Sequence, residues 1–219
     1  GPNDEIMIVT TTGSPYISSC VTREIEKLCK WSRQRSSLTR AVLAIHEFGF
    51  PVALPAALTA GLPVIEDCAW ICGSAGPDDP VGQQGDYVIY SFPKTWPMPF
   101  GGLLKSRAAV AAGPDQRRIS DEATRVLMRG LATHLPQRAA IKQVRRQNYA
   151  LYTRLFEASG FPPYFELAPE VIPHTFVFRL EDEARAKRAK GYMMAAGIES
   201  TVFFGAGGYY LPNHQNMSA

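Results

Sequence analysis

Short runs of apolar residues alternate with longer stretches of mixed polarity through the first half of the chain. Such runs are typical of parallel strands that helices cover on both faces of a sheet. Between the first two runs, apolar residues at helical spacing predict a crossover helix over 22–32, with Glu26 and Lys30 one turn apart. We expect strands at residues 5–10, 41–45, 63–66, 87–91 and 101–105. This half therefore predicts an α/β fold with a largely parallel sheet.

After about residue 115 the pattern changes to that of helices. One long helix that stops near Gly160 is predicted by its apolar side, Ile141, Val144, Tyr149, Tyr152, Leu155 and Phe156. A strand over 171–180, a helix over 181–196 and a strand over 198–204 follow. We expect a partial α/β large domain at 1–115, and a helical linker with a small α+β domain at 116–219.

Three stretches rich in glycine or proline predict loops, at residues 73–85, 93–99 and 204–208. In open α/β sheets, ligands bind outside the carboxyl ends of the strands. Asp67, His46 and Ser91 all fall at such ends. They are therefore candidates for a site at this edge of the sheet.

Composition is that of a folded globular protein, with 46% hydrophobic and 20% charged residues, which argues against disordered and collagen-like classes. No apolar run is long enough to cross a bilayer, and the first residues do not form a secretory signal, so we expect a cytoplasmic protein without a membrane partner. The four cysteines are then expected to be reduced. Cys68 and Cys72 have a helix-like separation, but small buried apolar side chains are favoured over a zinc site, and no metal is predicted.

Positive charge is concentrated between Arg117 and Arg154, where nine basic residues face two acidic ones. Such a segment could attract an anionic, nucleotide-linked substrate or nucleic acid. The alternative is a solvated helix surface. The arginines are spread over several turns without interleaved aromatic residues, which favours the solvated surface and argues against a nucleic-acid partner.

Asp67 and Lys94 follow two strands and lie 27 positions apart. A lysine amine can hold pyridoxal phosphate as a Schiff base, while a carboxylate beside the pyridine nitrogen keeps that nitrogen protonated. Each residue also has an ordinary interpretation, since an aspartate at a strand-to-helix turn is often a helix cap and a lysine in a proline-bounded loop often faces solvent. The pair together favours the cofactor.

The flanking motifs strengthen this interpretation. They are Ile45-His46-Glu47-Phe48-Gly49-Phe50-Pro51, Gly61-Leu62-Pro63-Val64-Ile65-Glu66-Asp67-Cys68-Ala69, Gly85-Asp86 leading through Tyr90-Ser91-Phe92 to Lys94, and Gly101-Gly102. In order and spacing, they resemble the DegT/StrS type of sugar aminotransferase, within the aspartate-aminotransferase-like fold type I of pyridoxal phosphate enzymes. The resemblance implies a homodimer with the active site at the subunit interface.

By this resemblance, Lys94 would form the Schiff base and shuttle the proton, and Asp67 would pair with the pyridine nitrogen. Ser91 would bind the cofactor phosphate, and Tyr16 would stack on the ring. Trp70 stands beside them, where the family has a glutamine or histidine. The implied substrates are an amino acid donor and a keto sugar, attached to a nucleotide.

Two histidines are candidate substrate residues: His46 ends a strand and could approach the cofactor ring, and His214 would face the substrate in the resembled family. The ordinary interpretation of His46, at the end of a strand, is a side chain satisfied by backbone hydrogen bonds.

Two alternatives to an aminotransferase stay open at this stage. The first is a non-catalytic relative that acts in binding or assembly, suggested by a serine-to-lysine spacing two residues shorter than the family's and by the absence of its phosphate loop. The second keeps the cofactor but changes the reaction to elimination or desulfurisation, since a fold does not fix the chemistry.

Overall fold

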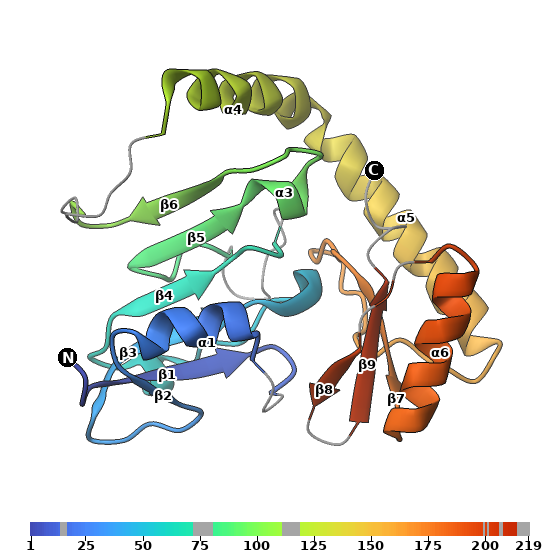
Figure 1. The fold of residues 1–219 in the computed structure, drawn as a ribbon, viewed down its shortest axis with the longest axis horizontal. Helices are drawn as coiled ribbons and strands as arrows, with labels where there is room; N and C mark the ends of the chain where they lie inside the picture. The colour runs from blue at the N-terminus through green and yellow to red at the C-terminus, as the bar shows by residue number, and fades with distance from the viewer. Residues whose placement is uncertain are drawn as a thin grey trace.

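The computed structural model describes residues 1–13, 17–71, 81–110, 119–198, 200, 202–205 and 208–213 (Figure 1). Its strands form two sheets. The larger has six strands in the order β2-β1-β3-β4-β5-β6, and the smaller has three in the order β7-β9-β8. The helices α4 and α5 lead from the last strand of the larger sheet toward the smaller one.

The larger sheet is parallel except at one edge. Its strands are β1 (Glu5–Thr10), β2 (Lys30–Ser32), β3 (Thr39–Ile45), β4 (Val64–Asp67), β5 (Tyr87–Ser91) and β6 (Gly102–Ser106). The first five run parallel to their neighbours, and β6 pairs antiparallel with β5. The prediction of a largely parallel α/β sheet is confirmed, and all five expected strands are present within one or two residues.

Apolar side chains cover both faces of this sheet, because successive residues of a strand point to opposite sides. On one face, Met7, Val42 and Val64 pack against the segment around α2 (Ala56–Thr59). On the other face, Ile8 and Leu43 pack against Ile25 and Val21 of α1 (Ser19–Glu26). The continuous apolar runs are thus explained by burial on both sides.

The crossover helix is shorter than predicted and begins earlier. α1 ends at Glu26, and Lys30, expected one turn further along the same helix, lies instead in β2. The backbone N–H of Lys30 donates to Asp4 O at 3.0 Å, so this short strand extends the parallel sheet beside β1. Leu28, expected on the apolar side of the helix, is 72% exposed. The hydrogen bonds that residues 30–32 form with the open edge of the sheet therefore outweighed the helical periodicity of the sequence.

In the second half, the residues that the structure describes form three α-helices, one 3-10 turn and a small antiparallel sheet. These elements are α4 (Asp121–His134), η2 (Leu135–Gln137), α5 (Arg138–Glu157), β7 (Phe176–Leu180), α6 (Glu183–Ala195), β8 (Phe203–Gly205) and β9 (Gly208–Asn213). The predicted C-terminal α+β part is confirmed. On α5, Ile141 and Tyr149 are buried as expected, whereas Leu155 is exposed.

Three boundaries in this half differ from expectation. The strand predicted from residue 171 begins at Phe176, because the backbone N–H groups of His174 and Thr175 donate instead to Phe48 O. Of the strand predicted over 198–204, the described residues place only 203 and 204 in a strand, β8, and of the turn expected at 204–208, the described residues lie in β8 and at the start of β9.

The loop after β3 joins the two halves of the molecule. Phe48 and Phe50, within and after η1 (Glu47–Gly49), belong to one core cluster with Tyr149 of α5 and Phe176 of β7. Gly49 has a φ of +94°, and a Cβ there would lie 2.3 Å from His174 N. Only glycine permits this close approach.

No helix among the described residues is long and apolar enough to span a membrane. The domain boundary expected near residue 115 falls in 111–118, outside the described residues, and stays a prediction.

Candidate active site

A pocket of about 120 Å³ lies at the carboxyl ends of β1, β3 and β4. It brings together Asp67, Lys94 and Trp70, three of the residues singled out in the sequence. Thr10, Ile17, Ser18, Cys20, Val21, Ile45, Glu47 and Phe48 complete the wall. This is the edge at which parallel α/β sheets bind their ligands.

Asp67 is the last residue of β4 and is partly buried. Its Oδ1 accepts a hydrogen bond from the backbone N–H of Ala69 at 2.9 Å, which fixes the carboxylate at the strand end. This bond is the local turn contact that a cap-like aspartate makes. Asp67 can therefore make this turn contact and also line the pocket, because the turn uses only one of its two carboxylate oxygens.

Lys94 lies on a one-turn helix, α3 (Phe92–Thr95), where a loop had been predicted. Ser91 precedes this helix and Pro93 occupies its first turn, where a missing N–H costs no hydrogen bond. The helix places Lys94 Nζ 4.9 Å from the centroid of the Trp70 ring. The amine is therefore held by a cation–π contact at the pocket wall, although the lysine side chain is largely exposed.

Trp70 is held in turn by other aromatic rings. Its centroid lies 5.3 Å from that of Phe48 and 5.1 Å from that of His174, both in edge-on arrangements. Such geometries are the favourable ones for aromatic pairs. The contact with His174 connects the pocket wall to the segment just before β7.

The sequence did not single out Glu47 or Phe48, which also line the pocket. Glu47 Oε2 accepts from Thr12 N at 2.8 Å and from Thr12 Oγ1 at 2.6 Å. Burial raises the pKa of Glu47 above its ordinary value, although these hydrogen bonds and the charge of Arg33 oppose the shift. Phe48 has a φ of +58°, which is strained for a non-glycine residue and is concentrated at functional sites. In the sequence, Glu47 directly follows His46 at the end of a predicted strand, and this position could have identified it as a candidate site residue.

Ser91 does not line this pocket. It lies at the start of α3 and lines a second pocket of about 370 Å³, on the side of the helix that also carries Phe92 and Thr95. The structure thus separates Ser91 from the wall formed by Asp67 and Lys94, and its expected contact with the cofactor phosphate stays a prediction.

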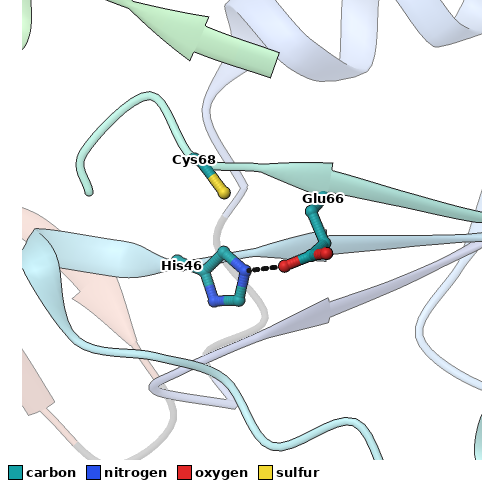
Figure 2. A group of neighbouring side chains, drawn as sticks. All are labelled: His46, Glu66 and Cys68. Carbon is teal, nitrogen blue, oxygen red and sulfur yellow. Dashed lines mark hydrogen bonds and ion pairs between the residues drawn. The ribbon is translucent and has the colours of Figure 1, made fainter. Parts of the chain in front are cut away.

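His46 is buried, with 2% of its surface exposed, and faces the interior rather than the pocket. Its Nδ1 accepts from the backbone N–H of Val52 at 3.0 Å, so in the neutral ring the proton resides on Nε2. Nε2 then donates to Glu66 Oε2 at 3.2 Å (Figure 2). This position does not support the expected substrate contact and agrees with the interpretation of a histidine satisfied by hydrogen bonds.

Glu66 is the centre of this buried network. Its Oε2 also accepts from Gly82 N at 2.8 Å, and its Oε1 accepts from Gly85 N. Burial by itself would raise the pKa of Glu66, but the hydrogen bonds from His46, Gly82 and Gly85 lower it below the ordinary value. The carboxylate therefore fastens the chain before β5 to the interior of the sheet.

His46, Glu66 and Cys68 lie together, with their potential ligand atoms within 4.8 Å of one another (Figure 2). The donor set does not suit a metal ion. Both ring nitrogens of His46 and both oxygens of Glu66 are already hydrogen-bonded. Burial, with the negative charges of Glu66 and Asp67, raises the pKa of the Cys68 thiol far above its usual range, whereas metals bind the thiolate.

Three residues from the sequence interpretation lie outside the described residues: Tyr16, Cys72 and His214. The proposed ring-stacking role of Tyr16 and substrate role of His214 stay predictions.

A family comparison supports the same chemistry. Residues 26–103 match the sequence model of the DegT/DnrJ/EryC1/StrS aminotransferase family. The matched segment includes Asp67, Ser91 and Lys94. No curated protein sequence matches the chain.

Solved structures share the fold at low sequence identity. The aminotransferase TlmJ from Streptoalloteichus hindustanus superposes with a TM-score of 0.74 at 17% identity, over 98% of this chain and 74% of that one. For 3-amino-5-hydroxybenzoic acid synthase the TM-score is 0.75 at 16% identity, over 100% and 77%. For the pyridoxal phosphate form of the putative sugar aminotransferase Spr1654 from Streptococcus pneumoniae it is 0.63 at 15% identity, over 100% and 78%. The sequence similarity to the DegT/DnrJ/EryC1/StrS aminotransferase family thus covers residues 26–103, and the likeness to the solved structures is one of fold.

Proposed function

We propose that the chain is a pyridoxal phosphate-dependent aminotransferase that transfers an amino group from an amino acid to a keto sugar attached to a nucleotide. One observation carries the proposal. Asp67 and Lys94, 27 positions apart in the sequence, line the same pocket at the carboxyl edge of the sheet. Both belong to the segment that matches an aminotransferase family.

The pocket residues fit the ring of this cofactor. A carboxylate, an amine and an indole ring converge on one small space, which is the set required beside a pyridine nitrogen, an aldehyde carbon and a ring face. When bound, the cofactor supplies an electron-accepting ring for the electron pair released at the Cα of the amino donor.

In the reaction, the residues of the chain would hold and transfer protons. Asp67 would hold the proton on the ring nitrogen. Lys94, the proposed attachment residue, would take the proton from the donor Cα on Nζ and return it in the second half of the reaction. Trp70 covers one side of the Lys94 amine and would exclude water there.

Lys94→Ala tests this assignment directly. We expect the variant to fold, because the Lys94 side chain is exposed, and to lose transamination by at least about 10²–10⁴-fold through loss of proton transfer alone. The measurements are a visible absorbance titration with pyridoxal phosphate, borohydride reduction, and peptide mapping of the reduced adduct. Lys187→Ala, at an exposed position on α6, is the control. Substantial transamination by Lys94→Ala, or an adduct at another lysine, would overturn the assignment.

One observation favours a second candidate, a subunit with this fold that acts in binding or assembly. The pocket is about 120 Å³, below the roughly 300–1,000 Å³ usual for small-molecule sites. This candidate predicts that no reducible absorbance band forms at any cofactor concentration. A band that forms without nitrogen transfer from a labelled donor would instead indicate elimination or desulfurisation.

A further inference from the structure

Glu47 is an acidic side chain of the pocket that Lys94 and Asp67 share, and the proposed proton transfers do not use it. Its backbone N–H donates to Thr11 Oγ1 at 3.0 Å, and its Oε2 accepts the two hydrogen bonds from Thr12. Thr11 and Thr12 directly follow β1, so these three hydrogen bonds fix Glu47 to the end of that strand. The carboxylate is therefore held in one place at the pocket wall.

The second carboxylate oxygen of Glu47 is open to a ligand. Oε1 accepts no hydrogen bond from any residue that the structure describes. It is not one of the described side-chain atoms that are buried without a partner, so it retains accessible surface. A carboxylate that served only to hold Thr12 would use Oε2 alone. Oε1 can therefore accept a hydrogen bond from a molecule in the pocket.

The charge of Glu47 has no ion-pair partner among the described residues. Arg33, whose charge acts on Glu47, donates through Nη2 to Thr10 Oγ1 at 2.8 Å instead. The Lys94 amine lies over the Trp70 ring. Burial of this unpaired carboxylate raises its pKa, and a cation beside Oε1 would offset the cost of that burial.

The balance of charge in the pocket indicates which ligand group suits Glu47. The titratable groups that the described part of the wall contributes are Cys20 of α1, Glu47, Asp67 of β4 and Lys94 of α3. Two of these are carboxylates and one is an amine, so with the acids and the amine ionised a further cation is favoured over a further anion. An ammonium group supplies both the charge and the N–H donors that Oε1 lacks.

We propose that Glu47 binds the ammonium group of the amino donor through Oε1, beside Lys94 in the same pocket, and so selects an amine that arrives charged. The proposal rests on the proposed aminotransferase function, because it assigns the charged end of that reaction's first substrate. Thr12 is then a positioning residue, since it acts by holding Glu47 Oε2. Protonation of Glu47 would remove the charge that attracts the donor.

The test is a carbon NMR titration of the Glu47 carboxyl group with methylammonium, in a chain isotopically labelled at glutamate Cδ. The chain is first treated with pyridoxal phosphate and borohydride, which stops turnover at Lys94. Glu47→Gln identifies the resonance by its loss and should fold, because the amide oxygen can still accept from Thr12. We expect methylammonium to lower the pH midpoint of the Glu47 resonance until the effect saturates, since a bound cation favours the ionised carboxylate.

Two controls separate binding from general charge effects. Tetramethylammonium at equal ionic strength carries the same charge without an N–H donor, and it should change the midpoint much less. Thr12→Val removes one hydrogen bond to Oε2, so it should raise the midpoint yet keep the response to methylammonium.

A kinetic measurement uses the chain with attached cofactor before reduction. With L-glutamate as the probe donor, Glu47→Gln should slow the loss of the cofactor absorbance band by about tenfold or more, because one charge-assisted hydrogen bond is lost. Hydroxylamine, an amine that is uncharged at neutral pH, should remove the band equally fast from both chains.

The proposal is overturned if methylammonium leaves the Glu47 midpoint unchanged, if tetramethylammonium changes it equally, or if Glu47→Gln slows L-glutamate and hydroxylamine alike. A chain that takes up no cofactor would instead refute the proposed function. The methylammonium titration of that chain would still decide whether Glu47 binds an ammonium group.

Discussion

Glu66 accepts hydrogen bonds from three separate segments, and its side chain is almost completely buried. In Glu66→Gln an NH₂ group replaces one acceptor oxygen, so at least one buried donor loses its partner. We expect a loss of about 1–3 kcal/mol in the free energy of unfolding at neutral pH. Urea denaturation measures the loss, and Glu24→Gln, on the exposed face of α1, serves as the control.

The same residue gives a pH dependence whose sign follows from its lowered pKa. The stabilisation by Glu66 is fully present above the ordinary carboxyl pKa and is lost as the pH falls through the lower folded value. The stability difference between the unaltered chain and Glu66→Gln should therefore shrink below about pH 4. A difference that stays constant into acid would show that the Glu66 charge does not contribute.

The pKa of Glu47 shifts in the opposite direction from that of Glu66, because burial raises it above the ordinary carboxyl value. Its carboxylate lines the Lys94 pocket and becomes protonated at a higher pH than an exposed glutamate does. We expect the rate of the amino-donor half-reaction to fall on the acid side in the unaltered chain, and this limb to disappear in Glu47→Gln. Glu157→Gln, an exposed acid on α5, should retain the limb.

At the scale of elements, two neighbouring arginines of α5 bind different parts of the molecule. Arg145 is buried and donates through Nη2 to Thr95 O at 2.9 Å, at the end of α3. Arg146 donates to the carbonyl groups of Ala168 and Val171. α5 thus holds the helix that carries Lys94 through one residue and the segment before β7 through the next.

This arrangement makes Arg145 a positioning residue for Lys94. Arg145→Met leaves the Thr95 carbonyl without this donor, and we expect a loss of about 1–3 kcal/mol in stability together with slower borohydride-trapped attachment of the cofactor to Lys94. Arg146→Met is the matched control, since it should destabilise the chain without changing attachment. Equal attachment rates in the two variants would show that Arg145 acts on stability alone.

At the scale of the whole molecule, apolar side chains remain exposed along the β6 edge of the larger sheet and on α4. Ile89, Leu103 and Leu104 of β5 and β6 are exposed, as are Val126 and Met128 of α4, and no α4 residue is buried. Figure 1 shows α4 beyond the β6 edge of the sheet. Exposed apolar clusters of this kind commonly mark protein interfaces.

We expect these surfaces to form the homodimer that the family resemblance implies. Analytical ultracentrifugation should give a dimer, and Leu104→Lys/Met128→Lys should shift it to monomer, because a lysine buried in an interface costs solvation energy. Tyr192→Lys, an exposed aromatic position on α6, should leave the association unchanged. A monomer at micromolar concentration in the unaltered chain would contradict the expectation.

Local patterns in the sequence were sufficient to predict five of the six strands of the larger sheet and the acid–lysine pair that follows two of them. Strands buried on both faces leave continuous apolar runs, and the residues that follow them must lie at one edge, so Asp67 was placed by local pattern alone. The same pattern failed at β2, since an open sheet edge, not a local preference, decided the conformation of Lys30–Ser32.

Which side chains share a pocket depends on how distant elements pack against one another. Ser91 and Lys94 are three positions apart, yet they line different pockets, because the direction of each side chain depends on how α3 packs. His46 turned inward to Glu66, and Arg138 and Lys142 reached the second pocket from α5, more than 40 positions beyond Ser91. Packing between elements that are far apart in the chain sets these side-chain directions. The local pattern of apolar and polar residues does not predict them.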